Sequence, residues 1–218
     1  KEAFKIGFFD EIKALLNKKR FLEIIHDFVV FDCGVKKLCR QNQYFGVKCA
    51  QKRIQDSNDG IIWHTQGSGK SLTMVWLAKW YKEFYSDGRV LVITDRVELD
   101  EQIEGVFAGV GETIIRTKSG SDLIERLDKS EDRLICSLVH KFGCATKSND
   151  NKATDEFIEN LKKTISKEFS PKGKILVFVD ECHRTQSGKL HEAMKEILPN
   201  AIFIGFTGTP LLKENKES

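Results

Sequence analysis

The chain has 218 residues, of which 40% are hydrophobic and 31% are charged, and its formal net charge is +3. These values are ordinary for a soluble globular protein, and the length suits one well-packed domain with a small appendage. The basic excess is too slight to indicate a nucleic-acid partner by itself.

The cellular context follows from what the sequence lacks. Its longest apolar runs are far shorter than the roughly 18 residues that a membrane span requires, and the N-terminus has no signal-peptide pattern. The six cysteines form no CxxC pair and no zinc-like spacing with histidine, which favours free thiols in a reducing compartment. We therefore expect a cytoplasmic protein with no membrane partner. Because the chain begins with Lys1, we also expect it to be a piece of a longer protein.

The first 56 residues are expected to form a helical prefix. Apolar residues recur at helical spacing over residues 8–31, with a charged break near residues 17–20, and again over residues 43–55. This pattern predicts three helices before the first strand of the main domain. We interpret residues 1–56 as a linker that precedes the main domain.

From residue 57 to residue 212 the pattern alternates between short apolar strands and helices. Helices are predicted, for example, over residues 71–85 and 188–198. Strands are predicted at residues 61–64, 90–94, 113–115, 133–138, 175–179 and 201–206. Such alternation predicts an α/β fold, a mostly parallel sheet covered by helices on both faces. Residues 147–174 are polar and are expected to form a surface excursion with a helix over 157–165, and residues 213–218 a polar tail.

A phosphate-binding loop is the strongest motif. It lies between a predicted strand and a predicted helix. Its glycines allow successive backbone N–H groups to face phosphate oxygens at the positive end of the helix, while Lys70 adds a cation and the Ser71 hydroxyl can ligate Mg²⁺. The usual pattern has glycine where His64 stands, and this departure argues against a small kinase or GTPase more than against nucleotide binding. The expected nucleotide-binding residues are Thr65, Gln66, Gly67, Ser68, Gly69, Lys70, Ser71 and Leu72.

A second motif consists of two carboxylates at the end of an apolar strand. Asp180 would lie beside the Mg²⁺ shell, partly through water, and Glu181 could accept a proton from an attacking water. Lys70, Asp180 and Glu181 are therefore the expected catalytic residues. His183 could be a metal ligand with Cys182 or His191, but we prefer a role in coupling.

A third motif, Gly205-Phe206-Thr207-Gly208-Thr209-Pro210, again ends an apolar strand. Its hydroxyl groups could hydrogen-bond towards the Asp180–His183 segment and towards a second lobe. We expect Thr207 and Thr209, with His183, to couple the nucleotide site to motion.

Together the three motifs resemble those of superfamily 2 helicases and translocases. At finer detail the chain is similar to the motor of the restriction (R) subunit of type I restriction-modification enzymes. The resemblance covers roughly residues 20 to 211 and is softer at Ser137 and Leu138. It is carried by Ile62-Trp63-His64-Thr65-Gln66-Gly67-Ser68-Gly69-Lys70-Ser71-Leu72-Thr73-Met74, Thr94-Asp95-Arg96-Val97-Glu98-Leu99-Asp100-Glu101-Gln102, Asp180-Glu181-Cys182-His183-Arg184-Thr185-Gln186 and Arg40-Gln41-Asn42-Gln43-Tyr44-Phe45.

The resemblance implies a RecA-like first motor lobe that uses ATP and Mg²⁺ to pump double-stranded DNA. It implies that Gln43 recognises adenine, and that Thr94, Arg96 and Lys141 contact DNA. It further implies an ATP-dependent type I deoxyribonuclease subunit that assembles with modification (methyltransferase) and specificity subunits. The nuclease domain would then precede Lys1 and the second lobe would follow Ser218, so the fragment alone would be nearly inactive.

Three alternatives remain. One is the ATP-binding lobe of another superfamily 2 DNA or RNA helicase. Another is a P-loop GTPase or kinase; a GTPase would need an Asn-Lys-x-Asp motif, but the Asn151-Lys152 and Asn215-Lys216 pairs lack the aspartate. A nucleotide-binding scaffold without catalysis is opposed by the intact Lys70, Asp180 and Glu181.

Overall fold

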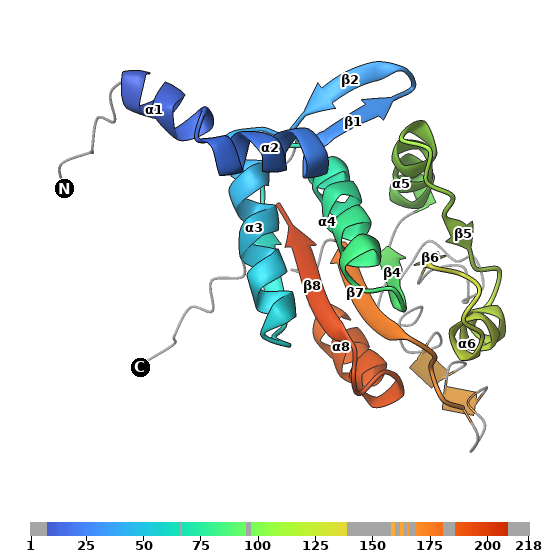
Figure 1. Ribbon diagram of the computed structural model, residues 1–218. Coiled ribbons are helices and arrows are strands. Elements are labelled where there is room, and N and C mark those ends of the chain that lie inside the picture. The colour runs from blue at the N-terminus through green and yellow to red at the C-terminus, as the bar shows by residue number, and fades with distance from the viewer. Residues whose placement is uncertain are drawn as a thin grey trace, which may run out of the picture.

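The computed structural model describes residues 8–65, 67–94, 97–138, 158–159, 162–163, 165, 169–180 and 186–208. A six-stranded sheet with the order β3-β8-β7-β4-β6-β5 forms the centre, and all its neighbouring strands are parallel (Figure 1). The strands are β3 (Gly60–Trp63), β4 (Gly88–Thr94), β5 (Ile115–Arg116), β6 (Leu134–Leu138), β7 (Lys174–Asp180) and β8 (Ile202–Thr207). Five of the six predicted strands are confirmed within two residues. The remaining strand, β5, is shorter and lies later than residues 113–115.

Helices cover both faces of this sheet, as the alternating pattern predicted. The described helices are α1 (Phe8–Leu15), α2 (Lys18–Asp27), α3 (Gln41–Gln55), α4 (Lys70–Phe84), α5 (Val97–Gly109), α6 (Gly120–Asp128) and α8 (Gln186–Ile197). None of them is long and apolar enough to cross a membrane. The helix expected over residues 157–165 lies mostly outside the described residues, although residues 158–159 and 162–163 are helical.

The pleat of the strands divides the core into two layers. In β4, Val90 and Val92 pack into the layer formed with α2, α3, α4 and α5, whereas Leu91 and Ile93 pack against α6 and α8. Successive strand residues point to opposite faces, so a strand buried on both sides is apolar over its central residues. This explains the continuous apolar run from Val90 to Ile93 in β4, a strand that is buried along its whole length.

One prediction for the prefix is wrong. The helix expected to run to residue 31 ends at Asp27, and the chain continues into an antiparallel hairpin of β1 (Val29–Asp32) and β2 (Val35–Leu38). Its two-residue turn, Cys33-Gly34, has positive φ at both positions (50° and 81°), the geometry that twisted hairpins prefer. Burial along β1 has the alternation of a strand: Val30 is buried, whereas its neighbours on both sides are more exposed.

The prefix shares its core with the sheet. Phe28, Val47 and Ile54 belong to the same buried cluster as Met74 of α4 and Val92 of β4. The division at residue 56 stays a prediction, and it falls between segments that pack together.

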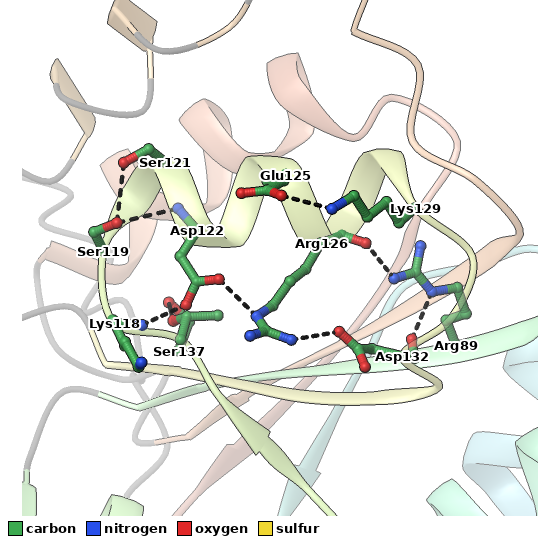
Figure 2. A network of polar contacts seen from close by, with 11 residues as sticks. Arg89, Lys118, Ser119, Ser121, Asp122, Glu125, Arg126, Lys129, Asp132 and Ser137 are labelled. Atoms are coloured by element: carbon green, nitrogen blue, oxygen red, sulfur yellow. Dashed lines mark hydrogen bonds and ion pairs between the residues drawn. The ribbon is translucent and has the colours of Figure 1, made fainter.

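The amino edge of the sheet is held by a buried arginine (Figure 2). The Arg89 guanidinium donates to the carbonyl oxygens of Arg126 at 2.7 Å and Asp132 at 2.8 Å, as Figure 2 shows. It also donates to the carbonyl oxygens of Leu127 and Lys172, both at 3.0 Å. The last carbonyls of a helix have no partner within the helix and carry its negative end, so a cation satisfies those of α6. This network fixes the end of the sheet that lies opposite the motifs.

Candidate nucleotide-binding site

The fold brings the three motifs to one edge. β8 lies between β3 and β7, with Trp63 paired to Thr207 and Asp180 paired to Phe206. The His64 amide donates to the Thr207 carbonyl at 3.0 Å, which extends this pairing to the start of the phosphate loop. Ligands of open parallel sheets bind outside the carboxyl ends of the strands, which is the edge described here.

The phosphate loop is built on two left-handed glycines. Gly67 and Gly69 have φ of +77° and +85°, a conformation that costs other residues about 1–2 kcal/mol. The Ser68 amide donates to the Thr65 carbonyl at 3.1 Å and closes the turn. Gly69 caps α4, and Lys70 is its first residue, so the loop opens at the positive end of a helix.

The loop offers polar groups that suit a phosphate. The Ser68 hydroxyl is buried and has no hydrogen-bond partner among the described residues. Lys70 and Ser71 follow it on the first turn of α4. A buried polar atom is costly unless a ligand or water satisfies it, so these side chains and the helix end fit an anionic ligand with a bound cation.

Asp180 ends β7 and is buried, and Thr207 ends β8 and is buried beside it. Their positions agree with the arrangement expected from the second and third motifs. The other predicted members of these motifs lie outside the described residues: Glu181, His183 and Thr209. Gln66 of the loop is likewise outside.

The predicted DNA-contacting residues are only partly visible. Thr94 ends β4 at the same edge, but it is 1% exposed, and its hydroxyl has no partner among the described residues. A DNA contact by Thr94 stays a prediction, and it would require this buried hydroxyl to become accessible. Arg96 and Lys141 lie outside the described residues.

Gln43, the expected adenine-recognising residue, lies against the phosphate loop. Its side chain is 2% exposed, and its amide nitrogen donates to the Ser68 carbonyl at 3.0 Å and the Gly69 carbonyl at 3.1 Å. Its amide oxygen accepts from the Arg40 backbone N–H at 2.8 Å, at the start of α3. The contact with the loop was not visible in the sequence. Recognition of adenine by this amide stays a prediction.

His64, the departure from the usual loop pattern, is accommodated by a glycine in α3. A Cβ on Gly46 would lie 3.2 Å from His64 Nε2, so the absent side chain leaves room for the imidazole. Burial lowers the pKa of His64; a hydrogen bond with the Asn42 backbone opposes this effect, and the nearby Lys70 charge adds to it. The net effect disfavours the charged form of the imidazole where it adjoins the loop.

The alternative reading of His191 as a metal ligand gains no support from its surroundings. Its ring packs against Phe203 with centroids 4.7 Å apart, and Nε2 lies 3.8 Å from Asp59, which precedes β3. These neighbours lie towards the amino ends of β8 and β3, whereas Asp180 ends β7. Cys182 and His183 lie outside the described residues.

Comparison with known families places the site in context. The family model described as "SWI2/SNF2 ATPase" matches residues 42–218. A putative type I restriction enzyme MjaIXP endonuclease subunit of Methanocaldococcus jannaschii is 32% identical over 212 residues, covering 92% of this chain and 19% of the relative. The type I restriction enzyme HindI endonuclease subunit of Haemophilus influenzae is 31% identical over 253 residues, covering 98% and 22%. The chain thus spans about a fifth of the length of these curated relatives.

Solved structures share the fold. The UvsW helicase from bacteriophage T4 has a TM-score of 0.59 at 18% identity, covering 88% of this chain and 60% of that one. A nuclease-deletion mutant of the Type ISP restriction-modification enzyme LlaGI, in complex with a DNA substrate mimic, has a TM-score of 0.55 at 15% identity, covering 80% and 18%. The RecA-like architecture expected from the sequence is therefore confirmed.

Proposed function

Because the chain belongs to the SWI2/SNF2 ATPase family, we propose that it is the first ATP-binding lobe of the DNA-translocating motor in a type I restriction endonuclease (R) subunit. The observation that carries the proposal is the convergence of the motifs at one sheet edge. There the phosphate loop opens α4, and Asp180 lies two strands away with Thr207 between them. The curated relatives support the assignment to the type I enzymes.

Four side chains have proposed roles in ATP binding and hydrolysis. Lys70 would bind the terminal phosphates, because a cation at a helix N-terminus offsets their charge. Ser71 and Asp180 would hold Mg²⁺, which supplies further charge neutralisation when bound. Glu181 would accept a proton from the water that attacks the γ-phosphate.

DNA and subunit partners belong to the protein as a whole. We propose double-stranded DNA as the translocated partner, gripped mainly through its phosphates by loops at this edge, with Arg96 and Lys141 as contacts. Modification and specificity subunits are the further proposed partners. A second lobe would supply the opposite side of the nucleotide site, as in related two-lobe motors.

The test is ATP hydrolysis by the full-length protein with and without linear duplex DNA. Lys70→Ala should abolish useful ATP affinity in calorimetry and DNA-stimulated phosphate release, because the triphosphate loses its main cationic partner. Lys79→Ala, on the same helix but away from its first turn, is the matched control and should behave as wild type. ATP binding of wild-type strength in Lys70→Ala would refute the site, and turnover indifferent to DNA would refute the motor.

A further inference from the structure

The first turn of α3 is hydrogen-bonded to the phosphate loop through Gln43. A primary amide has two N–H donors, and Gln43 directs both at loop carbonyls, those of Ser68 and Gly69. The Gly69 carbonyl also accepts from Thr73 of α4. The Ser68 carbonyl lies before the helix, and Gln43 is the donor that reaches it.

The direction of these carbonyls matters for phosphate binding. In a trans peptide the C=O and the following N–H point in opposite directions. Holding the Ser68 and Gly69 carbonyls towards Gln43 therefore turns the N–H groups of Gly69 and Lys70 away from α3. Phosphate oxygens bind N–H groups and are repelled by carbonyl oxygens, so the same tether that fixes the carbonyls also fixes the direction of the amides.

The fit between loop and helix is tight. A Cβ on Gly69 would lie 2.5 Å from Gln43 Nε2, which is closer than side-chain atoms approach one another. Three residues further along α3, the His64 imidazole occupies the space left by Gly46. The amide is thus enclosed, and its acceptor oxygen is held by the Arg40 N–H.

We propose that Gln43 is a positioning residue for the phosphate loop, one that orients the loop amides for a triphosphate whatever base is attached. This inference rests on the proposed ATP site and goes beyond recognition of adenine. The two roles compete for the same donors, because pairing with adenine N7 would take one N–H from a loop carbonyl.

A ligand without a base distinguishes positioning of the loop from recognition of adenine. The probe is inorganic tripolyphosphate with Mg²⁺, titrated calorimetrically into the full-length protein, with ATP titrated in parallel. Gln43→Met keeps the length of the side chain and removes both donors. Gln51→Met is the matched control: Gln51 is also buried on α3, and its amide nitrogen has no partner among the described residues.

Gln43→Met should weaken tripolyphosphate binding by about 5- to 30-fold, the range expected for two lost hydrogen bonds. Gln51→Met should bind as wild type. Hydrogen exchange of the loop amides should also quicken in Gln43→Met without nucleotide. If Gln43→Met does not fold, Gln43→Ala, which removes both donors without adding a charge beside the loop, should show the same weakening.

Three results are decisive. Wild-type tripolyphosphate affinity in the Gln43 variants, with ATP weakened, would overturn the inference and leave the ATP site intact. Equal weakening in Gln51→Met would also overturn it, because the effect would then come from the core of α3. Failure of the wild-type protein to bind either ligand would instead overturn the proposed function.

Discussion

The substitutions Gly67→Ala and Gly69→Ala should distinguish the cost of backbone strain in the phosphate loop from the cost of losing its contact with Gln43. Both positions have positive φ, but a Cβ on Gly67 meets no atom of the described residues within 4 Å, whereas one on Gly69 would lie 2.5 Å from Gln43 Nε2. Left-handed alanine costs about 1–2 kcal/mol, and the loss of glycine freedom in the unfolded chain returns about 0.4–1 kcal/mol. Gly67→Ala should therefore lower the free energy of unfolding by about 1 kcal/mol.

Gly69→Ala should cost more because the new methyl group must displace the Gln43 amide. The two hydrogen bonds at 3.0 and 3.1 Å contribute about 1 kcal/mol each, which brings the expected cost to about 3 kcal/mol. In a Gln43→Ala background the obstacle is gone, so the same glycine substitution should again cost about 1 kcal/mol. The structure thus predicts a coupling free energy of about 2 kcal/mol between positions 43 and 69.

Urea denaturation without nucleotide measures all four members of this cycle, with Gly67→Ala and its double variant with Gln43→Ala as a parallel cycle. The Gly67 cycle should be additive within about 0.5 kcal/mol. Additivity in the Gly69 cycle as well would refute the contact between Gln43 and the loop.

The remaining predictions concern catalysis, pH and the opposite edge. Glu181→Gln in the full-length protein should bind ATP but hydrolyse it about 10²-fold more slowly or worse, since the base is lost; near wild-type phosphate release would show that Glu181 is not the base. The pKa of His64 is lowered, so the stability that its neutral form contributes is complete above the unfolded value of about 6.5 and is lost as pH falls towards the folded pKa. His64→Asn should therefore flatten the loss of stability as pH falls below about 6.5 in urea titrations, and an unchanged slope would contradict this. Arg89→Met should cost about 3–5 kcal/mol of unfolding free energy because it leaves buried carbonyls unpaired. Arg133 is exposed, so Arg133→Met, which loses bonds to the Lys82, Gly88 and Tyr85 carbonyls, should cost about 1 kcal/mol or less; equal losses would exclude burial as the cause.

The location of the site could be predicted because strand ends in a parallel sheet share an edge. The phosphate loop, Asp180 and Thr207 each follow an apolar strand, so alternation of strands and helices was enough to place them together. No comparable rule existed for the hairpin after α2. Its strands have four residues each, and the apolar residues of the first continue the helical spacing of α2, so periodicity favoured the longer element.

The tether from Gln43 could not be predicted for a different reason. Its partners lie 25 and 26 residues away, and a buried amide gives no periodic signal of what it contacts. Resemblance assigned the residue to the base of the nucleotide, while the fold places it against the loop that precedes α4. A residue can be recognised from its motif without its contacts being known.

His64 and Gly46 are two unusual residues that look unrelated in the sequence but are in contact in the structure. Histidine stands where a phosphate loop usually has glycine, and glycine stands inside α3, where it costs about 1 kcal/mol relative to alanine. In the structure the two are one contact, because the space above Gly46 is filled by the His64 imidazole. The loop thus has a histidine side chain at position 64 in place of glycine, and α3 has a glycine at position 46 that leaves room for this side chain. The identity of either residue therefore constrains the other. The first turns of α3 contact the phosphate loop and form part of the candidate nucleotide-binding site.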